Sequence, residues 1–306
     1  MIEAGSIMEK IGFIGLGRMG LPMASNLVSG NYPVYGFDTD SNQLRRASNN
    51  GCVKCNSIAE VVEKTDIIVT MLPNSKNVEE VYFSPDGGIF LHTDKDKLIM
   101  DMSTVSPATT ELVAAEAAAR RIEFLDAPVG RLASHADAGE SLFMVGGSEL
   151  GFKRVEPLLK LMGSDIFHCG EAGAGTRTKL VNNFLAISYC QMNAEALSLM
   201  QVFGLELAKT LDVLYGTTAT NGQLKVAWPS KVLSGDTSPG FTIDLAHKDL
   251  SLVVEAANNQ SLSMPMAAAA REAFNLARRR GFGQKDFSAM LEQHCELHNL
   301  EKPRRL

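Results

Sequence analysis

The feature of the sequence that most restricts its fold is a glycine motif between an apolar run and a helical pattern. The run IGFIG (11–15) predicts a buried strand, and residues 19–29 have the periodicity of a helix. Glycine permits a tight turn and a close backbone approach, while the N–H groups that open a helix are directed at an anion. The intervening G-L-G-R-M-G therefore predicts a dinucleotide-binding turn, in which the expected cofactor contacts are Gly15, Leu16, Gly17, Arg18, Met19 and Gly20.

An acidic residue at the end of the next predicted strand bears on the cofactor. Asp38 ends the run PVYGFD (33–38), where a carboxylate can accept hydrogen bonds from the adenine ribose. A negative charge at this position repels the 2′-phosphate of NADP. Arg45 and Arg46 follow in the next helical pattern (41–49), and we interpret them as solvated. The sequence therefore favours NAD, with NADH preferred over NADPH.

The first half of the chain continues to alternate strands with helical patterns. Further strands are predicted at 66–72, 97–102, 122–129, 142–147 and 165–170. Continuous apolar strands separated by helices predict an α/β fold, a Rossmann-type, doubly wound and mostly parallel sheet. Ligands collect at the carboxyl ends of such strands. At those ends we expect further cofactor contacts from Leu72, Pro73, Asn74, Ser103 and Thr104.

The pattern changes after a glycine-rich segment, GEAGAGT (170–176). Helices are predicted at 180–202, 207–215, 243–258, 266–280 and 286–300, with no further strand. We therefore expect a dinucleotide-binding domain over residues 1–172. An all-α domain for substrate binding and oligomerisation is expected over residues 173–306, the two being joined by a long interdomain helix.

Composition excludes several classes of protein. The net charge of −6 gives no basic surface for nucleic acid, and the arginines at 278–280 are interpreted as solvated surface. No apolar run is long enough to span a membrane. Five cysteines, including the C-x-x-C of Cys52 and Cys55, lack the second ligand pair of a zinc site, so we expect no metal and a reducing, cytoplasmic location. Either Met1 or Met8 can be the natural start.

Four collinear blocks resemble the signatures of one enzyme family. The blocks are GFIGLGRMGLPMASNL (12–27), DAPV (126–129), GAGTRTKLVNN (173–183) and HKDL (247–250), and they are similar to those of the β-hydroxyacid dehydrogenases, such as the 3-hydroxyisobutyrate dehydrogenases. The resemblance implies an oxidoreductase acting on a CH–OH group and a homodimer or homotetramer.

Matched residue by residue, the resemblance also implies a catalytic site. Lys179 corresponds to the family's catalytic lysine and Asn183 to its orienting amide, and their i, i+4 spacing puts them on one helix face. An ammonium beside a carbonyl oxygen can stabilise the negative charge that hydride addition creates and can donate the proton. Lys248 and Asp249 match a pair that lies beside substrate and nicotinamide, although a surface ion network is an alternative for them.

The chain departs from the family where typical members read D-x-P-V-S-G-G. Here Gly130, Arg131 and Leu132 follow D-A-P-V, so a planar cation stands where the others offer a hydroxyl and small residues. With WPSKVLSGDTSPGFTIDLAHKDL (228–250), this substitution resembles the 3-sulfolactaldehyde reductases. The resemblance implies a substrate anion held by Arg131 and Asn182. Ala186 replaces a serine of those reductases, a loss for which Ser134 or Ser188 can compensate.

These observations predict an NADH-dependent reductase of a small anionic aldehyde, with Lys179 as general acid and base. We favour reduction of 3-sulfolactaldehyde to 2,3-dihydroxypropane-1-sulfonate. The alternatives are a dehydrogenase of the succinic semialdehyde/4-hydroxybutyrate or 3-hydroxyisobutyrate type, or a dinucleotide-binding protein without catalysis. Both Lys179 and Asn183 are present, which argues against the inactive form.

Overall fold

The structure, a computed structural model, describes residues 8–305 and divides into two compact units. The first unit runs to Lys179 and the second from Leu180. Met1, one of the two possible starts, lies outside the described residues. No helix among the described residues is long and apolar enough to cross a membrane.

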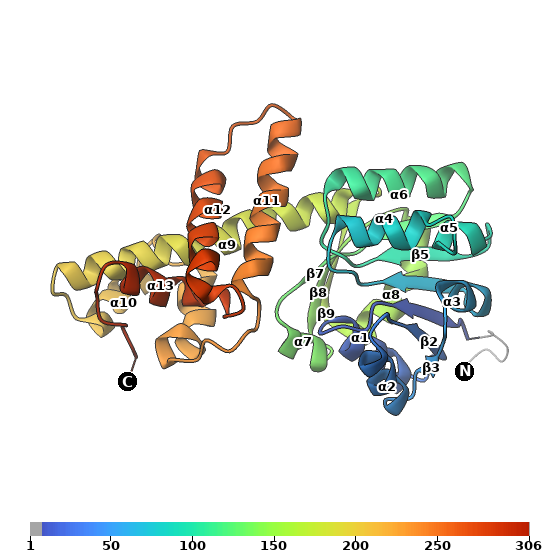
Figure 1. The fold of residues 1–306 in the computed structure, drawn as a ribbon, viewed down its shortest axis with the longest axis horizontal. Helices are drawn as coiled ribbons and strands as arrows, with labels where there is room; N and C mark the ends of the chain where they lie inside the picture. The colour runs from blue at the N-terminus through green and yellow to red at the C-terminus, as the bar shows by residue number, and fades with distance from the viewer. Residues whose placement is uncertain (1–7, 306) are drawn as a thin grey trace. The chain divides into compact units, whose positions relative to one another are not determined.

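A single sheet organises the first unit (Figure 1). Within residues 8–305 its strands follow the order β3-β2-β1-β4-β5-β6-β8-β7, and β9 pairs with β8. The pairs from β3 through β6 are parallel, and β8 is antiparallel to both β6 and β7. The strands are β1 (Ile11–Ile14), β2 (Val34–Phe37), β3 (Val53–Lys54), β4 (Ile67–Thr70), β5 (Leu98–Asp101), β6 (Glu123–Asp126), β7 (Val129–Gly130), β8 (Ser141–Gly146) and β9 (Gly163–Gly170). The predicted doubly wound, mostly parallel sheet is confirmed.

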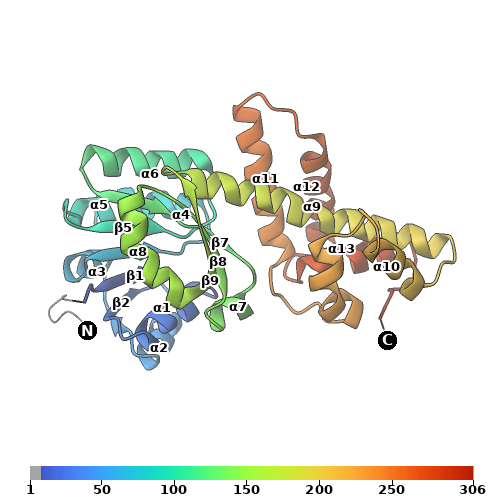
Figure 2. The same ribbon diagram turned by 180° about the vertical axis from the view of Figure 1, so that it is seen from behind.

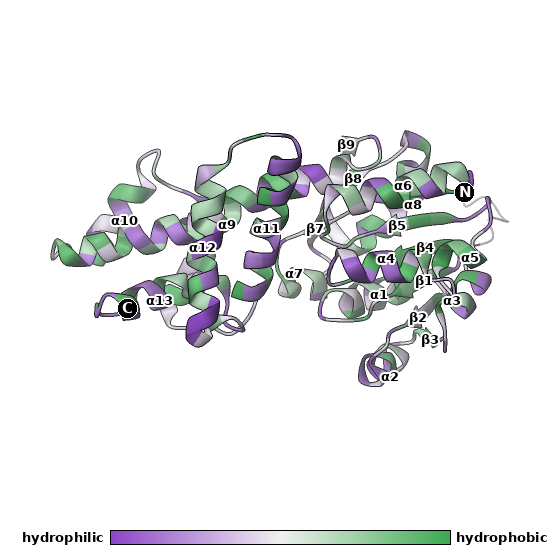
Figure 3. Cartoon of the chain, turned by 45° about the horizontal axis from the view of Figure 1, so that its top comes forward, coloured by the Kyte–Doolittle hydropathy of each residue, from purple (hydrophilic) through white to green (hydrophobic). Residues whose placement is uncertain are grey.

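Side chains of the central strands alternate between two cores, one on each face of the sheet. On β1, Phe13 packs into one core and Ile14 into the other, as alternation along a strand requires. Figures 1 and 2 show the two helical layers from opposite sides, and Figure 3 shows the central strands in the hydrophobic colour. One layer is α1 (Gly20–Ser29), α2 (Ser41–Asn49), α7 (Ala133–Asp137) and α8 (Glu149–Met162). The other is α3 (Ile58–Lys64), α4 (Ser75–Phe83), α5 (Ile89–His92) and α6 (Pro107–Ala119).

The same alternation separates the C-x-x-C thiols. Cys52 and Cys55 flank the short strand β3, and both are buried and unbridged. Cys52 packs into one core and Cys55 into the other, so the two sulfur atoms lie on opposite faces of the sheet. Burial raises the pKa of the Cys52 thiol to about 11.

The strand predicted over 122–129 is two strands, which corrects the expectation. β6 ends at Asp126, and β7 begins at Val129 and pairs antiparallel with β8. Pro128, which has no backbone N–H, lies between them. The backbone therefore turns out of the parallel sheet here, and residues 126–131 change direction at its carboxyl edge.

The second unit is helical around its own core, in which Trp228 and Phe274 are fully buried. Helix α12 ends earlier than predicted, at Ala277, and is followed by a wider turn in which Gly281 has a φ of 85°. The elements from the helix that crosses the unit boundary onward are α9 (Ala174–Val202), α10 (Leu207–Tyr215), η1 (Gln223–Ala227), η2 (Trp228–Ser230), η3 (Val232–Ser234), α11 (Ile243–Asn259), α12 (Pro265–Ala277), η4 (Arg278–Phe282), η5 (Phe287–Ala289) and α13 (Met290–Leu297).

Candidate active site

The glycines of the first turn each meet a different spatial requirement. Gly15 has a φ of 93°, and a side-chain carbon there would overlap the carbonyl oxygen of Met71. A carbon on Gly20 would overlap the carbonyl of Gly15, so this glycine lets α1 pack on the turn. A carbon on Gly17 would meet nothing within 4 Å. The open side at Gly17 is where a pyrophosphate can approach the backbone at the start of α1, so these residues fit a dinucleotide.

Asp38 is fixed against this turn. Its Oδ2 accepts a hydrogen bond from Leu16 N at 2.7 Å, and its Oδ1 accepts one from Asp40 N at 2.8 Å. The exposed Arg45 and Arg46 bond to Asn42 and Gln43 on their own helix. Each carboxylate oxygen of Asp38 can accept a further bond, which leaves capacity for ribose hydroxyls.

The loops after β4 and β5 are tied together at the same edge. Leu72 N donates to Ser103 Oγ at 2.9 Å, and Ser103 is buried. Asn74 accepts from Asn77 N and thereby caps α4. Pro73 is exposed and Thr104 is half-buried. The five predicted contacts therefore lie on two adjoining loops beside the glycine turn.

Helix α9 begins on a buried carboxylate. Asp126 Oδ1 accepts from Gly173 N and Oδ2 from Thr176 N, each at 2.6 Å. Burial raises the pKa of Asp126, against the lowering effect of these bonds. A side-chain carbon on Gly175 would overlap the carbonyl oxygen of Met144, so only glycine allows the helix to start this close to β8. The compact first unit extends to Lys179 and so includes the first turns of α9.

The first turns of α9 place Lys179 next to the end of β7. Its side chain is 9% exposed, and Nζ donates to the carbonyl oxygen of Val129 at 2.6 Å. Thr110 Oγ1 on α6 contacts Thr176 Oγ1 at 3.1 Å, which further fixes this end of the helix. The ammonium is therefore held beside Gly130, where the chain departs from the family pattern.

One turn further along α9 begins a second polar network. The amide Nδ2 of Asn183 donates to Asp249 Oδ2 at 2.6 Å, and Asn182 Nδ2 donates to Asn183 Oδ1 at 3.0 Å. Lys248 Nζ lies 3.1 Å from Asp249 Oδ1. Asp249 is buried, so its charge links Lys248 to the amide of Asn183. The structure thus joins these four predicted residues in one network.

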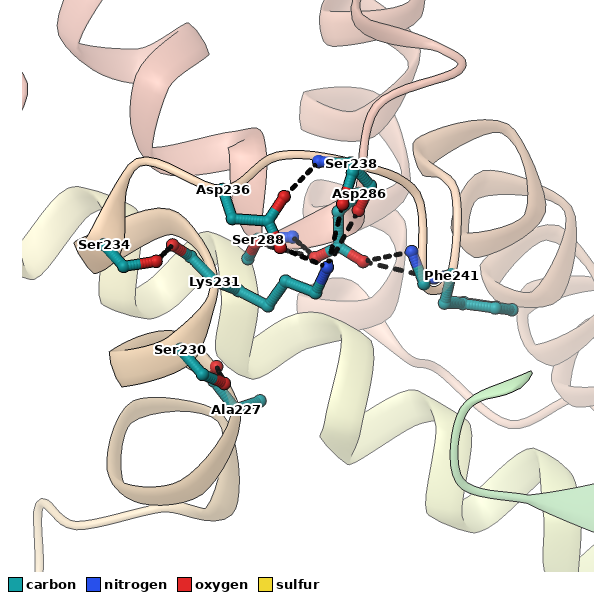
Figure 4. Close-up of polar contacts among 10 residues, drawn as sticks. Ala227, Ser230, Lys231, Ser234, Asp236, Ser238, Phe241, Asp286 and Ser288 are labelled. Carbon is teal, nitrogen blue, oxygen red and sulfur yellow. Dashed lines mark hydrogen bonds and ion pairs between the residues drawn. The ribbon is translucent and has the colours of Figure 1, made fainter. Parts of the chain in front are cut away.

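The segment that leads into α11 is fixed by two further side chains, shown in Figure 4. Buried Asp286 accepts from the backbone N–H groups of Gly240 and Phe241 at 3.0 and 3.1 Å. Lys231 Nζ donates to Asp236 Oδ2 at 2.7 Å and to the carbonyl oxygen of Ser238 at 3.0 Å. These bonds hold the segment directly before α11, the helix that carries Lys248 and Asp249.

Arg131 is the predicted residue whose surroundings differ most from expectation. It has a φ of 75°, and its guanidinium donates to Glu140 O, Ser164 Oγ and Asp165 Oδ2 at 2.6, 2.6 and 2.5 Å. Three of its five N–H donors are therefore engaged within the first unit, and an acid partly neutralises its charge. The hydrogen bond from Ser164 and the pairing with Arg131 hold the pKa of Asp165 below its usual range. Sequence gave no sign of this partner.

The two serines considered as replacements for the hydroxyl missing at Ala186 differ in exposure. Ser134 is exposed on α7. Ser188 is buried on α9, and its Oγ has no hydrogen-bond partner within residues 8–305. Ala186 itself accepts from Gln223 Nε2 through its carbonyl oxygen at 3.1 Å.

Sequence reasoning missed three structural carboxylates, Asp101, Asp126 and Asp286. Asp101 and Asp126 end β5 and β6, and their Cα atoms are paired in register. Burial raises the pKa of Asp101 to about 6. An acid at the end of an otherwise apolar strand, two residues before Ser or Pro, was the available signal for the first two.

Comparisons with known proteins agree with this geometry. Residues 10–170 match the NAD-binding domain of 6-phosphogluconate dehydrogenase, and residues 173–293 match a domain described as NAD-binding of NADP-dependent 3-hydroxyisobutyrate dehydrogenase. The 3-sulfolactaldehyde reductase of Escherichia coli is 39% identical over 94% of this chain and 96% of its own. The 2-(hydroxymethyl)glutarate dehydrogenase of Eubacterium barkeri is 38% identical over 92% and 94%.

A solved structure extends the likeness to three dimensions. The 3-hydroxyisobutyrate dehydrogenase of Mycobacterium tuberculosis, determined with L-serine, superposes with a TM-score of 0.88 at 32% identity, over 94% of this chain and 99% of that one. The chain belongs to the β-hydroxyacid dehydrogenase family. It is an oxidoreductase that uses a nicotinamide dinucleotide and acts on a CH–OH group.

The two glycines of the turn should respond differently to the same substitution. Gly20→Ala should lower the free energy of unfolding by about 1–3 kcal/mol, because its methyl group overlaps Gly15. Gly17→Ala should leave stability nearly unchanged and raise the Kd for NADH about tenfold, because its methyl group enters open space that the pyrophosphate needs. Thermal unfolding and NADH fluorescence titration measure the two effects. Equal losses of stability would contradict this assignment.

Proposed function

We propose that the protein reduces a small anionic aldehyde with NADH, and that 3-sulfolactaldehyde is the favoured substrate. The single observation that carries this proposal is the position of Lys179, whose ammonium lies at the end of β7 one helical turn before Asn183. The substitution at Gly130 and Arg131 supports an anionic substrate. Similarity to a 3-sulfolactaldehyde reductase over almost the whole chain supports the sulfonate.

The chemistry needs a hydride and a proton. When bound, NADH supplies the hydride to the aldehyde carbon, whose C=O π bond breaks as the new C–H bond forms. Lys179 donates its proton to the carbonyl oxygen, and the buried ammonium stabilises the charge that develops there. Val129 O orients Nζ, and the network of Asn183, Asp249 and Lys248 fixes the next turn of α9. In the reverse direction, Lys179 accepts the proton of the hydroxyl group.

A substrate panel tests the proposal directly. With NADH, kcat/KM is measured for 3-sulfolactaldehyde, succinic semialdehyde, methylmalonate semialdehyde and tartronate semialdehyde. We expect sulfolactaldehyde to have the highest value. A higher kcat/KM for a carboxylate semialdehyde would mean that the substrate carries a carboxylate and not a sulfonate, as Ala186 allows. The proposed class of reaction would be unchanged.

Removing the lysine should abolish turnover but not cofactor binding. Lys179→Ala should lower kcat by about 10²-fold or more, because the proton donor is lost. Lys179→Arg should not restore activity, because a guanidinium barely releases a proton near neutral pH. Steady-state rates and NADH titration separate the two effects. A kcat near that of the wild type in either variant would rule out Lys179 as the general acid.

Preference for NADH should depend on Asp38. Asp38→Ser should narrow the ratio of kcat/KM for NADH over NADPH by on the order of tenfold, because the repulsion of the 2′-phosphate is removed. Arg45→Ser is the matched control on the neighbouring helix and should leave the ratio near that of the wild type. A wild-type enzyme that prefers NADPH would refute the interpretation.

We assign the substrate anion to the two guanidinium N–H donors of Arg131 that do not bond to Glu140, Ser164 or Asp165. We propose that Gly130 and Asn182 also contact the substrate. Arg131→Lys should then lower kcat/KM for the anionic aldehyde by on the order of 10²-fold while the Kd for NADH hardly moves. Asp165→Asn removes the ion pair and keeps the cation, so it should lower kcat/KM far less. Similar losses of kcat/KM in both variants would mean that Arg131 only stabilises its loop and does not bind the substrate.

An exposed apolar stripe on α9 supports a homodimer or a homotetramer. Its members recur at helical spacing and include Val181, Leu185, Met192 and Leu199, which are 65%, 45%, 49% and 52% exposed. Contiguous apolar surface of this kind marks protein interfaces. Light scattering should give a multiple of the 33.0 kDa chain mass. Leu199→Glu should reduce that mass, whereas Leu262→Glu, at another exposed site, should not.

A further inference from the structure

A buried hydrogen-bond chain runs between β4, β5 and α4 behind the cofactor loops. Its centre is Asp101, the last residue of β5, which is 3% exposed. Asp101 Oδ1 accepts from Thr70 Oγ1 at 2.7 Å and from Ser103 Oγ at 2.6 Å. It also accepts from Ser103 N at 3.2 Å. One carboxylate oxygen therefore takes three hydrogen bonds, one from Thr70 on β4 and two from Ser103 in the loop after β5.

The charge of Asp101 fixes the direction of every bond in this chain. An ionised carboxylate only accepts, so the hydroxyl groups of Thr70 and Ser103 must both donate to it. Each hydroxyl oxygen then accepts from its other neighbour. Tyr82 O–H, on α4, donates to Thr70 Oγ1 at 2.8 Å. Leu72 N donates to Ser103 Oγ at 2.9 Å.

The hydrogen-bond chain ends at Leu72, which is one of the expected cofactor contacts. Leu72 and Ser103 lie in the two loops that follow β4 and β5. Strand β4 ends beside the glycine turn that follows β1, and β5 ends beside β4. Gly15 lies directly against Met71 and Leu72, so the position of the β4 loop limits where the turn can lie. A displacement of Ser103 would release both loops.

We infer that Asp101 is a positioning residue for dinucleotide binding, which acts through Ser103 to hold the β4 and β5 loops in one arrangement. The inference rests on the proposed cofactor contacts of these loops. Burying a carboxylate is unfavourable unless it is well hydrogen-bonded, and the raised pKa of Asp101 reflects that cost. A neutral residue would avoid the cost but would not orient both hydroxyl groups.

A double-mutant cycle on the full chain tests the coupling. Asp101→Asn and Ser103→Ala should each raise the Kd for NADH about tenfold, because a charge-assisted bond to the loop is lost. The Kd of the double variant for NADH should be no higher than that of the single variant with the higher Kd, because both substitutions remove the same link. Tyr82→Phe, which removes only the hydroxyl at the far end of the chain, should stay within about twofold of the wild type. The inference would be overturned if the increases in Kd of the two single variants multiplied in the double variant. It would also be overturned if Tyr82→Phe raised the Kd as much as Asp101→Asn does.

The pH dependence of NADH binding gives a second readout that does not require Asp101→Asn to fold. The titratable groups that face Asp101 are Tyr82 from α4 and Asp126 from β6. As the pH falls through about 6, Asp101 gains a proton and becomes a weaker acceptor, so the Kd for NADH should rise. In Ser103→Ala this rise should be largely lost, because the link to Leu72 is already broken. A profile unchanged by Ser103→Ala contradicts the inference, whereas a wild type that does not bind NADH at all contradicts the proposed function instead.

Discussion

The hydrogen bonds from the start of α9 to Asp126 are the interaction on which the site depends. Asp126 ends β6, and its two oxygens take Gly173 N and Thr176 N, so a negative charge meets the positive end of a long helix. Lys179 follows within two turns and reaches Val129 O. A loss of this contact would move the ammonium and Asn183 together, because they share the helix.

Asp101 and Asp126, at the ends of neighbouring strands, hold different elements of the site in place. The two residues are in register on β5 and β6, and both are buried. Neither carboxylate hydrogen-bonds to a cationic side chain of residues 8–305. Asp126 is stabilised by backbone N–H groups and holds a helix, whereas Asp101 is stabilised by hydroxyl groups and holds loops. Because the ends of packed strands are rigid, the two carboxylates hold the start of α9 and the β4 and β5 loops in defined positions.

Residues 129–131 make two of the contacts in the proposed site. Val129 binds Lys179 through its carbonyl, and Arg131, two residues on, is bound to Asp165. Relatives of similar identity are described as acting on a sulfonated aldehyde and on a hydroxymethyl dicarboxylate. We propose that the side chain at position 131 selects the anion, whereas the carbonyl of Val129 positions Lys179.

The sequence by itself determined the elements whose signals are local. The strand–turn–helix of residues 11–29, the limits of α2 and α10 and the acid at Asp38 could all be read from periodicity and spacing. Only the tertiary structure decided the break between β6 and β7, the pairing of Arg131 with Asp165 and the bond from Asn183 to Asp249. The last two join residues 34 and 66 positions apart. Their geometry depends on where separate elements pack, so neither contact can be inferred from spacing along the chain.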